Sequence, residues 1–99
     1  MRSVDNLELV RWRAMASIDV LRLLADQVKE DPSFHPRSSY LTTRWHAHVA
    51  GHDWEFLFTG PKFWDVRMDR GGGGAIDLVM HIHGITFKAA AKLLKERGV

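Results

Sequence analysis

The chain has 99 residues, of which 45% are hydrophobic and 26% are charged, which suits one domain spanning residues 1–99 around one core. No apolar run reaches the length of about 18 residues that a membrane-spanning helix needs, and the first residues lack a signal-peptide pattern. The net charge of +2 permits nucleic-acid binding without indicating it. Because cysteine is absent, disulfides are excluded and a cytoplasmic protein is expected.

The first third of the chain has a helical pattern, from about residue 4 to residue 30. Ser17 is a candidate N-cap, because its hydroxyl can accept a hydrogen bond from a free backbone N–H of the next turn. Apolar residues then recur at the spacing of one helical face, at Val20, Leu21, Leu24 and Val28. Residues 31–39 contain two prolines and three serines, which predicts a loop.

From residue 40 to residue 68 the hydrophobic period changes to two, which is typical of strands. The alternating residues are Trp45, Ala47 and Val49, then Trp54, Phe56 and Phe58. Turns are expected at residues 50–53 and 59–62, with a third strand over residues 63–68. The expected product is a three-stranded antiparallel meander.

The last third predicts two helices. Residues 71–74 are all glycine and should break the third strand, leaving free N–H groups at the start of a helix over residues 75–83. Gly84 should end that helix, and Thr86 should cap a final helix over about residues 87–97. The predicted fold is therefore α+β, with two N-terminal helices, the three-stranded sheet and two C-terminal helices.

The last third has a glycine pair, an apolar helix with a methionine, a glycine break and a second helix, at Gly72, Gly73, Ile76, Met80, Gly84, Phe87, Ala90 and Leu94. The order and spacing of these residues resemble the zinc-binding domain of bacterial-type DNA primases. Residues 62–73 align without gaps to the family's aromatic strand and second pair of metal ligands. The two cysteine positions of that pair hold Val66 and Asp69.

The resemblance implies a degenerate, cysteine-free zinc ribbon of the kind found beside Toprim nucleotidyl-transfer domains in mobile-element proteins. It implies a non-catalytic module that holds single-stranded DNA weakly for a Toprim, primase or other replication partner. The alternative is a protein-interaction module that binds no nucleic acid. We expect no cofactor and no metal, and a core rich in aromatic side chains in place of zinc.

Five residues are the candidate nucleic-acid site: Arg44, Lys62, Trp64, Arg67 and Arg70. Basic groups neutralise phosphates, and aromatic faces stack on unpaired bases. The alternative for the four basic residues is an ordinary solvated sheet face, and for Trp64 a place in the core.

Two further patterns each leave two interpretations open. His46, His48 and His52 have a spacing at which the first two share a strand face, so they could bind zinc, or they could pair with carboxylates such as Asp53 and Glu55. Residues 71–74 could contact an anion through backbone N–H groups, or serve as a simple hinge.

No pattern in the chain indicates catalysis. Asp65, Asp69 and Asp77 show no nucleophile–base spacing. The histidines of the third helix, His81 and His83, are expected at the surface.

Overall fold

The computed structural model describes residues 6–37 and 39–99, which form four helices and five strands. In chain order the elements are α1 (Asn6–Ala14), α2 (Ser17–Leu24), β1 (Gln27–Glu30), β2 (Thr43–Val49), β3 (His52–Thr59), β4 (Lys62–Asp65), β5 (Arg70–Gly73), α3 (Ala75–His83) and α4 (Phe87–Glu96). The α+β class and the four helices agree with the prediction. The three-stranded sheet is wrong, because the sheet has five strands in the order β1-β2-β3-β4-β5, each antiparallel to its neighbours.

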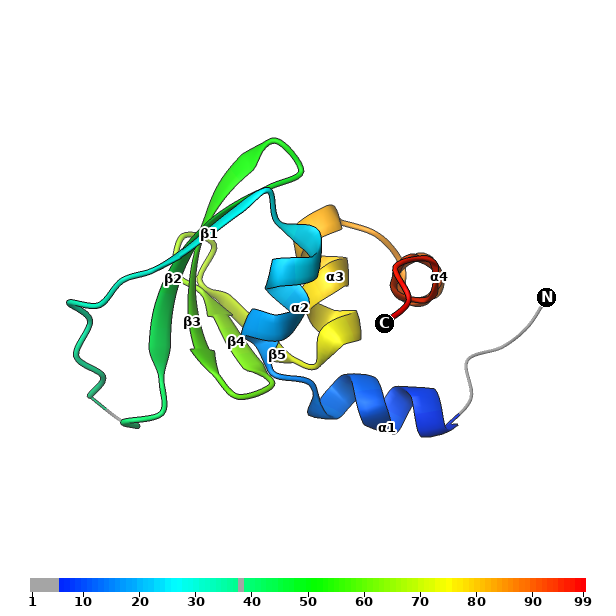
Figure 1. Cartoon of the computed structure of the whole chain (residues 1–99), viewed down its shortest axis with the longest axis horizontal. Helices are drawn as coiled ribbons and strands as arrows, with labels where there is room; N and C mark the ends of the chain where they lie inside the picture. Colours follow the sequence, from blue (N-terminus) through cyan, green and yellow to red (C-terminus); the bar gives the residue numbers. More distant parts are fainter. Residues whose placement is uncertain (1–5, 38) are drawn as a thin grey trace.

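The helices cover only one face of this sheet (Figure 1). We call the covered face the inner face and the opposite one the outer face. Side chains on β2, β3 and β4 alternate between them, as the period of two predicts. A row of directly paired residues, Trp45, Phe56 and Asp65, lies on the inner face. Phe56 is fully buried, which confirms the predicted register of β3.

β1 was missed because it lies in the segment expected to be helical. α2 ends when Ala25 adopts extended geometry, with φ of −90° and ψ of 145°. The backbone N–H of Asp26 then donates to the carbonyl of His48, and β1 pairs with β2. Only Val28 in β1 is half-buried, so the strand is stabilised by its backbone partners on β2 rather than by an apolar pattern.

β5 was missed because three of its four residues are glycines, which have low strand propensity. The strand exists because its neighbour β4 supplies side chains that cover both faces of the glycine backbone. A Cβ atom on Gly71 would lie 2.7 Å from the ring of Trp64, and one on Gly72 would lie 3.0 Å from the ring of Phe63. The predicted third strand is correspondingly shorter, since β4 ends at Asp65.

The helix boundaries follow the expected chemistry at most ends. Gly84 is left-handed at the end of α3, and the Thr86 hydroxyl accepts a hydrogen bond from the N–H of Ala89 at the start of α4. Gly74, which leads into α3, has φ of +90°, a conformation that favours glycine. Ser17 is not the N-cap: Ala16 holds that place, and the Ser17 hydroxyl donates to the carbonyl of Pro61.

α3 lies between the sheet and α4, α2 packs beside it, and α1 contributes a buried Trp12 (Figure 1). Of the helices in residues 6–37 and 39–99, none has both the length and the apolar character that a bilayer crossing requires.

Candidate functional site

The outer face carries an exposed aromatic ring beside β5, of whose four residues three are glycine. Arg44, Leu57, Trp64 and Gly71 form a row of directly paired positions across β2, β3, β4 and β5. Trp64 is 42% exposed, and its ring covers Gly71. The indole therefore presents one face to solvent while the other is held against the sheet.

The structure brings together three of the five predicted residues. Arg44, Lys62 and Trp64 all lie on the outer face. Arg67 lies in the turn after β4, where its Nη1 donates to the carbonyl of Asp53 at 3.3 Å. Arg70 lies directly opposite the buried Asp65 in the β4–β5 register, so its side chain is on the inner side of the sheet.

Arg44 is already engaged by carboxylates. Its guanidinium forms an ion pair with Glu55 and approaches Asp31 at 3.9 Å. Lys62 differs from Arg44, because it forms no ion pair within 4.0 Å in the part of the chain described. The positive charge available to a phosphate on the outer face is less than the sequence suggests.

His46 and His48 also pair with carboxylates on this face. His48 Nδ1 lies 2.9 Å from Asp53 Oδ1, and this hydrogen bond is the main reason that the pKa of Asp53 is lowered. His46 Nδ1 lies 3.8 Å from Glu55 Oε1. Across residues 6–37 and 39–99, no group of three or more His, Asp or Glu side chains is arranged to hold a metal ion.

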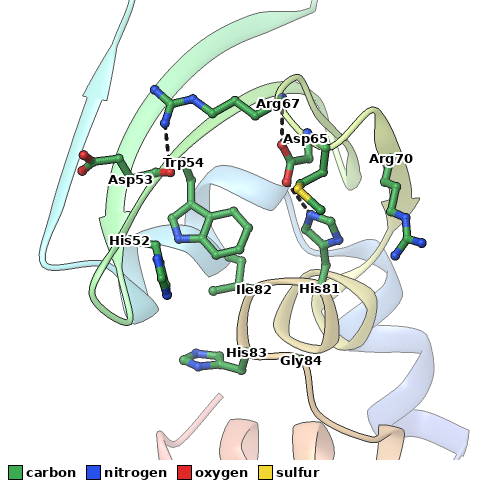
Figure 2. Close-up of a pocket in the computed structure, with 11 residues that line it drawn as sticks. His52, Asp53, Trp54, Asp65, Arg67, Arg70, His81, Ile82, His83 and Gly84 are labelled. Carbon is green, nitrogen blue, oxygen red and sulfur yellow. Dashed lines mark hydrogen bonds and ion pairs between the residues drawn. The ribbon is translucent and has the colours of Figure 1, made fainter.

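A buried carboxylate–imidazole pair lies on the other side of the sheet (Figure 2). Asp65 is 1% exposed. Its Oδ1 accepts from the backbone N–H groups of Arg67 and Met68, both at 3.0 Å, and its Oδ2 lies 2.6 Å from His81 Nε2. The pair thus joins the end of β4, the turn after it and α3.

Aromatic rings surround His81, which contradicts its expected place at the surface. The imidazole lies 5.5 Å from the ring of Phe63, 5.8 Å from Trp54 and 6.2 Å from Phe56, centroid to centroid. The sequence did contain a signal for this pair: Asp65 follows Phe63 by two residues, so it had to face the core. A carboxylate in that position needs a buried partner.

A cavity of about 460 Å³ opens beside this pair, and we call it the Trp54 cavity. It lies between the start of β3, the turn from β4 to β5, and the last turn of α3 (Figure 2). Its lining residues are His52, Asp53, Trp54, Asp65, Arg67, Met68, Arg70, His81, Ile82, His83 and Gly84. None is a serine, threonine, cysteine or lysine, so its histidines and the carboxylates of Asp53 and Asp65 are its only candidate nucleophiles.

His83, at the edge of this cavity, is only partly at the surface. Burial, and then the positive charge of Arg97, lower the pKa of His83 below its usual value. This imidazole is therefore neutral near pH 7.

Comparison with known proteins gives no family for this chain. No family model matches it, and neither a curated protein nor a solved structure matches it significantly.

Proposed function

We propose that the chain is a non-catalytic module that binds single-stranded DNA weakly through the outer face of its sheet. One observation carries the proposal. Trp64 lies over Gly71 with a solvent-exposed indole, on a face that no helix of residues 6–37 and 39–99 covers. Exposed aromatic rings on a sheet are where unpaired bases stack, and stacking accepts any base because every base has a π-face.

Charge near this ring supports contact with the phosphate backbone. Lys62 lies on the same face of the same strand as Trp64, two residues away. Arg44 lies two strands from Trp64 in the same row, but Glu55 and Asp31 offset its charge. We therefore expect a dissociation constant of about 1 μM or weaker at physiological salt, the range of non-specific binding.

The resemblance of residues 62–94 to the primase zinc-binding domain supports the same proposal. In this proposal the module holds template for a Toprim, primase or other replication protein, in the same polypeptide or in a partner. The module itself performs no chemistry.

The test is a titration of the whole chain with labelled single- and double-stranded oligonucleotides at several salt concentrations. Trp64→Ala should weaken single-strand binding by about 1–3 kcal/mol. Phe87→Ala is the matched control, because Phe87 is an equally exposed aromatic residue at the start of α4. Trp64→Leu keeps an apolar side chain over Gly71 and separates lost stacking from lost folding.

Lys62→Ala should weaken binding to every sequence and reduce the salt slope by about 1, because one phosphate contact is lost. Lys92→Ala on α4 should change neither, since Lys92 lies on a helix away from the sheet. No detectable binding by the folded chain at low salt would contradict the proposal.

That negative result would favour the rival function, a protein-interaction module. A specific feature supports this rival: the exposed Trp64 is followed in the next turn by two more exposed apolar residues, Val66 and Met68. Such a group is suited to docking another protein.

A further inference from the structure

The Trp54 cavity lies apart from the outer face and is not needed for strand binding there. Its volume of about 460 Å³ falls within the range of roughly 300–1,000 Å³ that small-molecule sites occupy. Elements far apart in sequence form its walls, because β3, the turn after β4 and the end of α3 meet there.

Ring stacking and hydrogen bonds hold the aromatic wall of this cavity in place. The indole of Trp54 stacks on Phe56 with ring centroids 5.8 Å apart and 4° between the planes. Its Nε1 donates to the carbonyl of Val49 at 3.0 Å. His81 stands edge-on to the same indole, and the hydrogen bond to Asp65 fixes its orientation. A planar heterocycle therefore meets rings that are already in place, so little side-chain entropy is lost on binding.

Arg70, at the rim of the cavity, can bind an anion. Arg67 and Arg70 line it, and both carboxylates in the lining have other partners: Asp53 bonds to His48, while Asp65 bonds to His81 and two backbone N–H groups. Within the described part of the chain, no carboxylate lies within ion-pair distance of Arg70. Figure 2 shows Arg70 on the far side of His81 from Trp54, so base and phosphate contacts fall on opposite sides of one imidazole.

The last turn of α3 supplies acceptors for a base. Ile82, His83 and Gly84 line the cavity where this helix ends. The last carbonyl groups of a helix have no partner within it. Such carbonyl oxygens can accept hydrogen bonds from the exocyclic amino group of a nucleobase.

We propose that the Trp54 cavity binds one nucleotide, with its base against Trp54 and His81 and its phosphate at Arg70. The nucleotide is either free or the 5′-phosphorylated end of a strand. The proposal does not require the outer face to bind DNA.

The test follows backbone and indole N–H resonances of the whole chain by NMR during titration with the four deoxynucleoside monophosphates. Saturable shifts are expected at the Trp54 indole and at Gly84. Deoxyadenosine alone and inorganic phosphate alone should each bind at least about tenfold more weakly than the nucleotide, because each makes only part of the contacts.

Arg70→Gln should weaken nucleotide binding about tenfold, as expected for loss of a charge-assisted hydrogen bond. Lys62→Gln is the matched control, since it removes an exposed cation of the outer face and should leave nucleotide affinity unchanged. Trp64→Ala should also leave it unchanged, so that failure of the outer face and failure of the cavity are distinguished.

A 5′-phosphorylated dinucleotide identifies the source of the ligand. Tighter binding than the mononucleotide assigns the cavity to a strand end, and equal or weaker binding assigns it to a free nucleotide. Three results would overturn the proposal: no shift at Trp54 with any nucleotide at millimolar concentration, equal losses in Arg70→Gln and Lys62→Gln, or inorganic phosphate binding as tightly as the nucleotide.

Discussion

At the scale of single residues, Asp65 illustrates how one carboxylate organises its surroundings. It lies at a position that strand alternation directs into the core, and it is buried there. A buried charge is costly unless it is paired and hydrogen-bonded. His81 and the N–H groups of Arg67 and Met68 meet that requirement and hold the turn after β4 against α3.

We expect Asp65→Ala to destabilise the fold by about 1–3 kcal/mol, because it leaves His81 and two partly buried backbone N–H groups without their acceptor. Urea denaturation followed by tryptophan fluorescence measures the loss. Asp69→Asn is the control: Asp69 is exposed in the same turn with φ of 55°, a conformation that asparagine tolerates. Equal effects of the two substitutions would show that Asp65 has no special role.

His83 should make stability depend on pH in a defined window. Its pKa is lowered in the folded chain, chiefly by burial, from the usual value of 6.5. The unfolded chain therefore takes up a proton first, and stability decreases as the pH falls from 6.5 to the folded pKa. Above 6.5 the imidazole is neutral in both states and has no effect.

Melting temperatures at about pH 7.5 and about pH 5.5 test this, with a smaller difference expected for His83→Gln than for the wild type. His35→Gln, in the exposed loop after β1, should keep the wild-type difference. The pKa values of Asp31 and Asp53 are lowered from 3.8, so these carboxylates change the stability at acidic pH, near and below 3.8. They do not contribute to the window of His83.

At the scale of elements, β5 depends on the side chains of a neighbouring strand. Trp64 and Phe63 cover Gly71 and Gly72 from opposite faces. A Cβ atom on Gly71 would overlap the Trp64 ring and the Phe63 carbonyl, whereas one on Gly72 would be in tight contact with the Phe63 ring, which would have to shift slightly. Gly74 has a different requirement, since its φ of 90° and ψ of 163° are accessible almost only to glycine.

Gly71→Ala should therefore destabilise the chain, because the new Cβ would lie 2.7 Å from the Trp64 ring and 2.8 Å from the Phe63 carbonyl. Gly73→Ala is the matched control in the same strand, where the nearest atom is 3.9 Å away. Thermal melting should show a clear loss for the first and little change for the second. If all four glycines tolerated valine, the account of this segment would be wrong.

At the scale of the whole molecule, an aromatic core occupies the centre of the fold. Trp45, Phe56, Phe58 and Phe63 are buried on the inner face. Each contributes about 4–6 kcal/mol of hydrophobic stabilisation as an upper estimate, whereas a structural zinc contributes roughly 10–16 kcal/mol in small domains. As an upper estimate, the burial of four such side chains is therefore of the same order as the stabilisation that a structural zinc gives.

We predict that the purified chain contains well under one zinc per molecule. Chelator should leave its melting temperature unchanged, because the core and the Asp65–His81 pair connect the elements without an ion. Stoichiometric zinc that is lost on substitution of His46 or His48 would contradict this.

The sequence by itself determined the elements whose geometry can be predicted from a local pattern of neighbouring residues. Local patterns predict several features that the structure confirms: the hairpin turns, β2, β3, α3, and the helix ends at Gly84 and Thr86. In each case the hydrophobic period or the cap lies within a few neighbouring residues.

Tertiary contacts decided the rest. β1 and β5 are strands because adjacent strands supply backbone partners and covering rings, information absent from residues 27–30 and 70–73 themselves. The same holds for the sites. Arg44 and Arg67 look free in the sequence but are held by Glu55 and by the Asp53 carbonyl, and Asp65 meets His81 across 16 positions. Charge and hydrogen bonding depend on spatial neighbours, and those neighbours exist only once the chain has folded.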